Sequence, residues 1–187
     1  MSSFPIHTIE SAPEEARETL RHVKQSIGMI PNLAAGMAEA PSLLRAFFAA
    51  RDAYIGGTLR PVEIQVLSLA NAFENGCEWC MAFHSAGALN DGLSKEALED
   101  LRAGRDPDDA RLGALSRLSR ALIRNRGEVR EEELEAFYAA GFGRAQALEV
   151  VLGIGFSTMA NYAGHLVQAP LGGMLEPYAW SRPAVGA

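Results

Sequence analysis

Apolar residues recur three and four positions apart along most of the chain, which is the spacing of one face of an α-helix. β-Branched residues are sparse, and nowhere do apolar and polar positions alternate as they would in a half-buried strand. Proline and glycine separate the apolar segments and supply helix starts and stops. The pattern predicts an all-α chain with helices over about 13–27, 32–40, 41–55, 61–75, 77–90, 94–103, 112–126, 130–140 and 144–166.

The segment 61–75 is apolar on one stripe and over much of its remaining surface, so we expect it to lie centrally in the core. No low-complexity segment or long linker divides the chain, which predicts a single domain over 1–187. An N-terminal arm of about 1–12 and an irregular tail of about 170–187 flank the helices. The aromatic residues of the tail are expected to dock on the domain; they are Tyr178 and Trp180.

Composition supports this picture and excludes several classes of function. The chain has 187 residues, 48% of them hydrophobic, and its 31 alanines favour helix. A net charge of −6 argues against nucleic-acid binding. No apolar run reaches the roughly 18 residues that indicate a membrane span, and the N-terminus lacks the basic and apolar regions of a secretory signal. We therefore expect a cytoplasmic protein that binds neither nucleic acid nor membrane.

The two cysteines stand three residues apart, as Cys77 and Cys80, and His84 follows four residues later. On a helix these three positions share one narrow face. Cys77 would also lie in the first helical turn, where free N–H groups and the helix dipole stabilise a thiolate. A thiol of lowered pKa with a base one turn away is what a reactive dithiol requires.

Two other interpretations of the cysteine pair stay open. Free cysteines are often buried as small hydrophobic residues. A Cys-x-x-Cys pair followed by a histidine also supplies three ligands of the zinc type, but no second pair or neighbouring histidine completes a tetrahedron. We therefore expect neither a metal nor another cofactor.

Two polar residues of the segment 61–75 are candidates for the same site. Glu63 could return to the thiols as a carboxylate that orients His84 or relays a proton. It also stands at the third position after the helix start, where glutamate caps the helix. Gln65 is polar in an apolar helix, as a residue of the site or of its rim.

The last predicted helix has two further features. Gly153, Gly155 and Gly164 lower its helix propensity, and we expect them to permit close approach of a neighbouring helix. Its polar positions repeat the dithiol spacing and align Thr158, Asn161 and His165 with Cys77, Cys80 and His84. This alignment is either the trace of an internal duplication or a coincidence. Asn161 and His165 are accordingly either site-lining residues or residues that hold the helix in place.

Arginine recurs between Arg111 and Arg130. Such a run is either a solvated face or a docking patch for an acidic partner.

The segments 59–70 (LRPVEIQVLSLA) and 75–85 (NGCEWCMAFHS) resemble the AhpD-like alkylhydroperoxidase family of the carboxymuconolactone decarboxylase superfamily, and its peroxidase-related branch most closely. The resemblance extends over about residues 20–180. It implies an all-α, AhpD-like multi-helix bundle with a degenerate internal two-fold repeat, assembled as a homo-oligomer, a trimer or hexamer.

The resemblance also implies a function and roles for the residues. It indicates a thiol-dependent peroxidase in which Cys80 attacks a hydroperoxide, Cys77 resolves the sulfenic acid, and His84 is the base. An external dithiol then reduces the disulfide. Gln65 stands where the family has its relay glutamate, so a substitution by Glu63 stays open. The alternatives are a non-peroxidatic dithiol redox or assembly module and, less expected, a decarboxylase-type enzyme.

Overall fold

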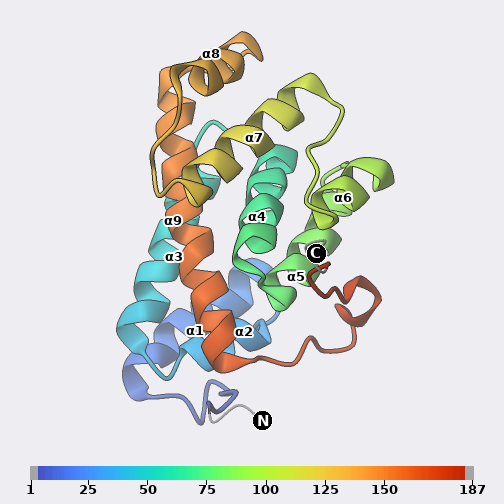
Figure 1. Cartoon of the computed structure of the whole chain (residues 1–187). Coiled ribbons are helices and arrows are strands. Elements are labelled where there is room, and N and C mark those ends of the chain that lie inside the picture. Colours follow the sequence, from blue (N-terminus) through green and yellow to red (C-terminus); the bar gives the residue numbers. More distant parts are fainter. Residues whose placement is uncertain (1–3, 184–187) are drawn as a thin grey trace.

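The computed structural model describes residues 4–183, and within that range it contains helices and no β-strand (Figure 1). This confirms the all-α prediction. The predicted arm and tail extend at their ends into residues 1–3 and 184–187, which lie outside the described range. The elements are α1 (Glu14–Ile27), α2 (Asn32–Met37), α3 (Pro41–Ile55), α4 (Pro61–Asn75), α5 (Glu78–Asn90), α6 (Lys95–Arg102), α7 (Ala110–Arg124), α8 (Glu131–Ala139), α9 (Arg144–Val167) and the short 3-10 helix η1 (Glu176–Tyr178).

Helix α4 is the centre of the molecule, as its apolar pattern predicts. It packs against α5, α7 and α9, and Figure 1 shows it enclosed by these helices. Side chains from Val66 to Ala72 are buried without interruption. Burial on all sides of a helix leaves its polar residues facing protein groups, so their partners matter for the site.

The turn from α4 to α5 brings the cysteines against the core. Pro61 occupies the first turn of α4, where its missing N–H costs nothing, and Gly76 ends the helix. Gly76 has a φ of +67°, which favours glycine because it lacks a Cβ. Cys77 then becomes the N-cap of α5.

Helix α9 runs the height of the molecule and contacts α2, α3, α4 and α5 (Figure 1). Two of its glycines allow close approach, as predicted: a Cβ on Gly153 would lie 2.7 Å from the ring of Tyr54, and one on Gly164 would lie 3.0 Å from Cys77 Sγ. The prediction is wrong for Gly155, where a Cβ would meet no atom within 4 Å.

Helix α9 is also long and apolar enough to cross a membrane by length and composition, although 44% of its most apolar window is buried within the protein. It is the one such helix among residues 4–183. The packing of α9 against α3 and α4 accounts for the apolar residues on one side of the helix. The cytoplasmic location stays a prediction.

The segment after α9 returns along the α5–α6 side of the molecule. Trp180 Nε1 donates a hydrogen bond of 2.8 Å to the carbonyl of Arg102, and the Arg102 guanidinium donates to the carbonyls of Tyr178 and Ala179. The predicted docking is confirmed for Trp180, whose ring packs against the core. The Trp180 side chain thus binds the end of α6, whereas Tyr178 is held through its backbone carbonyl.

The arginine run is not a uniform surface. Arg111 binds the buried Glu63, and Arg120 is itself buried, where it lies over the ring of Phe73 and donates to the carbonyl of Gly104. Arg124 forms a two-bond pair with Glu74. These three arginines therefore hold α7 against its neighbours, which is neither of the two roles expected for the run.

Candidate active site

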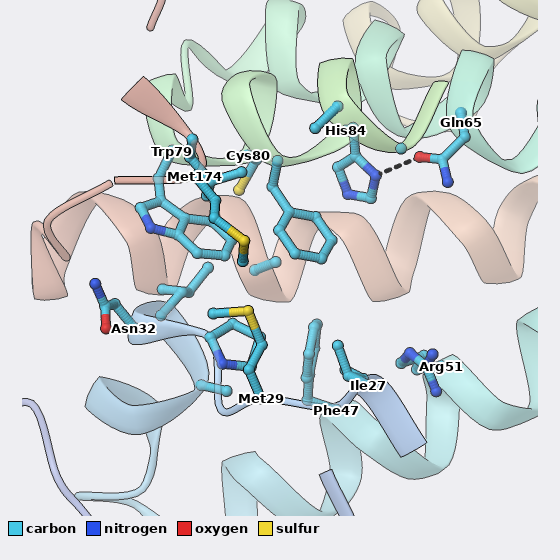
Figure 2. A pocket seen from close by; sticks show the side chains of 18 of the residues that line it. Ile27, Met29, Asn32, Phe47, Arg51, Gln65, Trp79, Cys80, His84 and Met174 are labelled. Carbon is cyan, nitrogen blue, oxygen red and sulfur yellow. Dashed lines mark hydrogen bonds between the residues drawn. The ribbon is translucent and has the colours of Figure 1, made fainter. Parts of the chain in front are cut away.

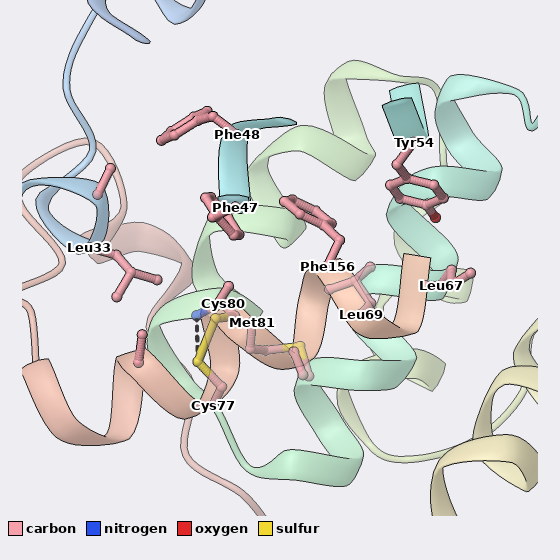
Figure 3. Packing of buried hydrophobic residues seen from close by; sticks show 14 of the residues in the cluster. Leu33, Phe47, Phe48, Tyr54, Leu67, Leu69, Cys77, Cys80, Met81 and Phe156 are labelled. Carbon is pink, nitrogen blue, oxygen red and sulfur yellow. Dashed lines mark hydrogen bonds between the residues drawn. A yellow bond between two sulfur atoms is a disulfide. The ribbon is translucent and has the colours of Figure 1, made fainter. Parts of the chain in front are cut away.

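The two cysteines form a close pair at the start of α5, and their sulfurs are joined as a disulfide (Figure 3). Their Cα atoms lie 5.3 Å apart, within the range that a disulfide spans. Each residue is only 2% exposed. Cys77 Sγ accepts a hydrogen bond of 3.3 Å from the backbone N–H of Cys80, as an N-cap side chain does. The start of α5 therefore stabilises negative charge on Cys77 in particular.

A cavity of about 580 Å³ opens beside this pair (Figure 2). Its walls come from α1 to α5, from α9 and from residues 171–175, which follow α9. Most of the lining is apolar and includes Phe47, Trp79, Phe156 and three methionines, Met29, Met37 and Met174. Cys80 lines the cavity and Cys77 does not. A ligand in the cavity would therefore contact Cys80 but not Cys77.

His84 lies on the wall of the same cavity, two turns into α5. Its Nδ1 is 2.8 Å from Oε1 of Gln65 (Figure 2). Burial lowers the pKa of His84 to about 4, because the apolar surroundings disfavour the charged ring. The imidazole is therefore neutral near pH 7, with a lone pair on one of its ring nitrogens.

Gln65 also binds a residue that the sequence analysis did not single out. Its Nε2 donates a hydrogen bond of 2.8 Å to Oδ2 of Asp91, just beyond the end of α5. Gly87 makes this possible, since a Cβ there would lie 2.8 Å from Nε2 of Gln65. In the sequence, Asp91 and Gly92 indicate only the end of a helix. Because Gln65 and Asp91 stand 26 residues apart, no local pattern predicts their contact.

Glu63 lies elsewhere. Its carboxylate accepts hydrogen bonds from the backbone N–H of Arg60 at 2.8 Å, from the Arg60 guanidinium at 2.8 Å and from Arg111 at 2.6 Å. Burial alone would raise the pKa of Glu63, but these bonds outweigh it and lower the pKa. Glu63 is not among the residues that line the cavity. The geometry thus shows the capping role, and a catalytic role of Glu63 stays a prediction.

Asn161 and His165 both bind Asn75, the last residue of α4. Asn161 Oδ1 accepts from Asn75 Nδ2 at 2.9 Å, and His165 Nε2 lies 2.8 Å from the Asn75 carbonyl oxygen. Neither lines the cavity. Of the two interpretations, these contacts favour residues that hold α9 and the α4–α5 turn together. The internal duplication stays a prediction.

Within residues 4–183 no group of three or more histidine, cysteine, aspartate or glutamate side chains is arranged to hold a metal ion. The site brings together a pair of cysteines, a neutral imidazole and an apolar cavity.

Residues 41–122 match the sequence model of the carboxymuconolactone decarboxylase family. This segment contains the cysteine pair, His84, Gln65 and Asp91. No curated protein matches the sequence significantly.

Solved structures resemble the whole chain. One is an uncharacterized peroxidase-related protein from Ralstonia eutropha JMP134, described as an alkylhydroperoxidase AhpD core, with a TM-score of 0.77 and 23% identity over 93% of this chain and 94% of that chain. A second peroxidase-related protein, from Silicibacter sp. TM1040, has a TM-score of 0.75 and 20% identity over 92% of each chain. A variant of the debrominase Bmp8 in complex with 2,3,4-tribromopyrrole has a TM-score of 0.71 and 14% identity over 94% of each chain. At these identities the likeness is one of fold, and it confirms the expected AhpD-like architecture.

Proposed function

From the match of residues 41–122 to the carboxymuconolactone decarboxylase family and from the AhpD-like fold, we propose that the chain is an enzyme that reduces organic hydroperoxides through its dithiol. One observation carries the proposal: Cys80 and the neutral His84 line the same apolar cavity, while Cys77 lies behind Cys80 within disulfide range. A nucleophile, a base and a resolving thiol thus stand in the order that a peroxidase cycle needs.

In the first step His84 takes the proton of the Cys80 thiol, and the thiolate attacks the terminal oxygen of R–O–O–H. The O–O bond breaks, a sulfenic acid forms on Cys80, and the departing alkoxide leaves as R–OH with the proton that His84 returns. Sulfur is oxidised by two electrons and the peroxide is reduced by two.

In the second step the thiol of Cys77 condenses with the sulfenic acid, which forms the disulfide and releases water. An external dithiol then attacks the disulfide and is itself oxidised. Attack on Cys80, the sulfur on the cavity side, makes Cys77 the leaving thiolate. The hydrogen bond from the Cys80 N–H and the start of α5 stabilise that leaving group.

The cavity supports a bulky, apolar R group. Its lining is mostly aromatic and aliphatic, and its volume exceeds what hydrogen peroxide fills. Methionines at its edge, Met29 and Met174, can adapt to substrates of different shape. We therefore expect cumene hydroperoxide to oxidise the reduced protein at least about tenfold faster than hydrogen peroxide does, since burial of apolar area adds binding energy.

The test is single-turnover oxidation of the reduced protein by each peroxide, with sulfenic acid trapped and detected by mass spectrometry. The variants Cys80→Ser and Cys77→Ser form a matched pair, because each removes one sulfur of the same disulfide. We expect Cys80→Ser to consume no peroxide, and Cys77→Ser to form one sulfenic acid and then stop.

Two outcomes contradict the proposal. If Cys77→Ser is inert and Cys80→Ser reacts, the two roles are reversed. If the wild-type protein reacts with neither peroxide faster than a free thiol does, the dithiol belongs to a redox or assembly module without peroxidase activity.

A further inference from the structure

A chain of hydrogen bonds leads from the end of α5 to His84. Asp91 Oδ2 accepts from Gln65 Nε2 at 2.8 Å, and Gln65 Oε1 lies 2.8 Å from His84 Nδ1. All three residues line the cavity beside Cys80. Figure 2 shows the imidazole at the cavity wall with Nδ1 turned toward Gln65.

The chain has a direction, which the carboxylate sets. An ionised carboxylate only accepts hydrogen bonds, so the NH₂ group of Gln65 must face Asp91. The carbonyl oxygen of the same amide then faces His84. Because a carbonyl oxygen also only accepts, the proton of the neutral imidazole must sit on Nδ1. Nε2 is left with its lone pair.

We infer that Asp91 is a positioning residue that acts through the amide of Gln65 to hold His84 in the tautomer with a free Nε2, the nitrogen that serves as the base for Cys80. The role of Nε2 as a base rests on the proposed function, whereas the tautomer rests on the hydrogen bonds alone.

Asp91 is the residue of this wall that fixes the orientation of the Gln65 amide. Among the residues of 4–183 that line the cavity, Asp91 carries the only carboxylate and Arg51 of α3 the only permanent positive charge. Arg51 pairs with Asp52 rather than with the amide. Glu63, the acidic residue near the start of α4, is paired with two arginines. Without Asp91, nothing in this wall requires the amide of Gln65 to present its oxygen.

The loss of Asp91 has a specific consequence. A freed amide can turn over and present its NH₂ group to Nδ1, which then needs a lone pair. The imidazole proton would move to Nε2 in those molecules, and the nitrogen that should accept a proton would carry one. A reduced population of the competent tautomer lowers the rate of thiol deprotonation in proportion.

The first experiment reads the tautomer directly by ¹⁵N NMR of the histidine rings, with the His84→Gln variant to identify the signals. We expect the wild-type protein to hold the proton on Nδ1 and Asp91→Ala to show both tautomers. Adding Gln65→Glu to Asp91→Ala should restore the Nδ1–H form, because a carboxylate beside the ring can only accept. Asp52→Ala is the matched control: it removes a carboxylate bonded to Arg51 on another wall of the cavity and should leave the tautomer unchanged.

The second experiment measures the single-turnover oxidation of Cys80 in the same variants. We expect Asp91→Ala to be about tenfold slower than wild type, a part of the 100-fold or more that a positioned base supplies. Gln65→Glu in that background should recover the rate to within about threefold, a rescue that a merely structural loss of the helix end would not allow.

The outcomes separate the two claims. An unchanged tautomer in Asp91→Ala, or a slowed rate that Gln65→Glu fails to restore, overturns the inference. A shifted tautomer in a protein whose wild type reacts with no hydroperoxide supports the positioning role and overturns the proposed function.

Discussion

Two polar residues on one helix, Glu63 and Gln65, show how strongly position decides the use of a side chain. They stand two residues apart on α4, which turns them to different sides of the helix. Glu63 faces Arg60 and Arg111 and completes the capping of the helix, whereas Gln65 faces His84 and Asp91. The amide oxygen of Gln65 can accept a hydrogen bond from the His84 ring as a carboxylate would. It faces the ring because the carboxylate of Asp91 binds the NH₂ group of the same amide.

The lowered pKa of His84 predicts how stability depends on pH. The unfolded chain takes up a proton near the ordinary histidine pKa of 6.5, and the folded protein only near 4. The unfolded state therefore binds more protons between these values, and the free energy of unfolding falls as the pH is lowered through them. In the oxidised protein, where the cysteines do not titrate, this loss amounts to at most about 2 kcal/mol at pH 5, since His84 keeps some exposure.

Urea denaturation of the oxidised protein at pH 7.5 and pH 5 measures the effect. The difference between the two pH values should be smaller in His84→Gln than in wild type. His22→Gln is the control, because the side chain of His22 is 58% exposed and should leave the difference as it is. Equal pH dependence in all three proteins would show that His84 titrates normally.

At the scale of elements, proline and glycine made most helix ends readable in the sequence. Helices α1, α3 and α4 end where Gly28, Gly56 and Gly76 stand, and α3 and α4 begin at prolines. The prediction for α2 is too long, since that helix ends at Met37 rather than near Ala40. Ala40 precedes Pro41, whose ring disfavours the helical conformation of the residue before it. The local rules were thus sufficient for element type and for most boundaries.

Only part of the site could be predicted from the sequence, because several of its contacts join residues that are far apart along the chain. Cys77, Cys80 and His84 lie within one helix start, so spacing alone placed them together. The contact of Gln65 with Asp91 depends on how α4 and the end of α5 meet in three dimensions. The cavity depends on α1, α2, α3 and the segment after α9, which no pattern in the sequence links to the cysteines.

The approach of α9 to the dithiol supplies a prediction about packing. A Cβ on Gly164 would lie 3.0 Å from Cys77 Sγ, and the sulfur is held by the helix start and the disulfide. Gly164→Ala should therefore destabilise the oxidised protein by about 1–2 kcal/mol, even though alanine favours helix by roughly 1 kcal/mol. Denaturation in urea gives the value.

The matched comparison is the same substitution in a Cys77→Ala background. With the sulfur gone, Gly164→Ala should become neutral or stabilising by up to about 1 kcal/mol. A cost that persists without the sulfur would place the clash elsewhere in the α5–α9 contact.

At the scale of the whole molecule, α9 has one face that no other segment of residues 4–183 covers. Large apolar residues three and four positions apart stand on this face, with exposures of 73% for Leu148, 53% for Val151 and 36% for Leu152. Tyr162 and Leu166 continue the stripe toward the end of the helix. Gly155 lies in its middle, where a Cβ would meet no atom of the described residues within 4 Å. Contiguous exposed apolar surface of this kind is typical of an interface.

We expect a second copy of the chain to cover this face, in keeping with the oligomer that the family resemblance implies. A homo-oligomer closed by symmetry uses the same patch on every subunit, so a charge placed in the stripe enters each interface at once. Leu148→Lys combined with Leu166→Lys should convert the oligomer to a monomer in sedimentation velocity at micromolar concentration. Tyr138→Lys on α8 is the control, since it alters an exposed aromatic residue outside the stripe and should leave assembly intact. A wild-type protein that sediments as a monomer, or an oligomer that withstands both lysines, would mean that α9 is not the contact.

Helix α9 also lies close to Cys77 at Gly164, where a Cβ would be 3.0 Å from Cys77 Sγ. An interface on the outer face of α9 would therefore stiffen the helix that packs against the dithiol. In the monomeric variant, we expect α9 to be the first helix to lose protection from hydrogen exchange.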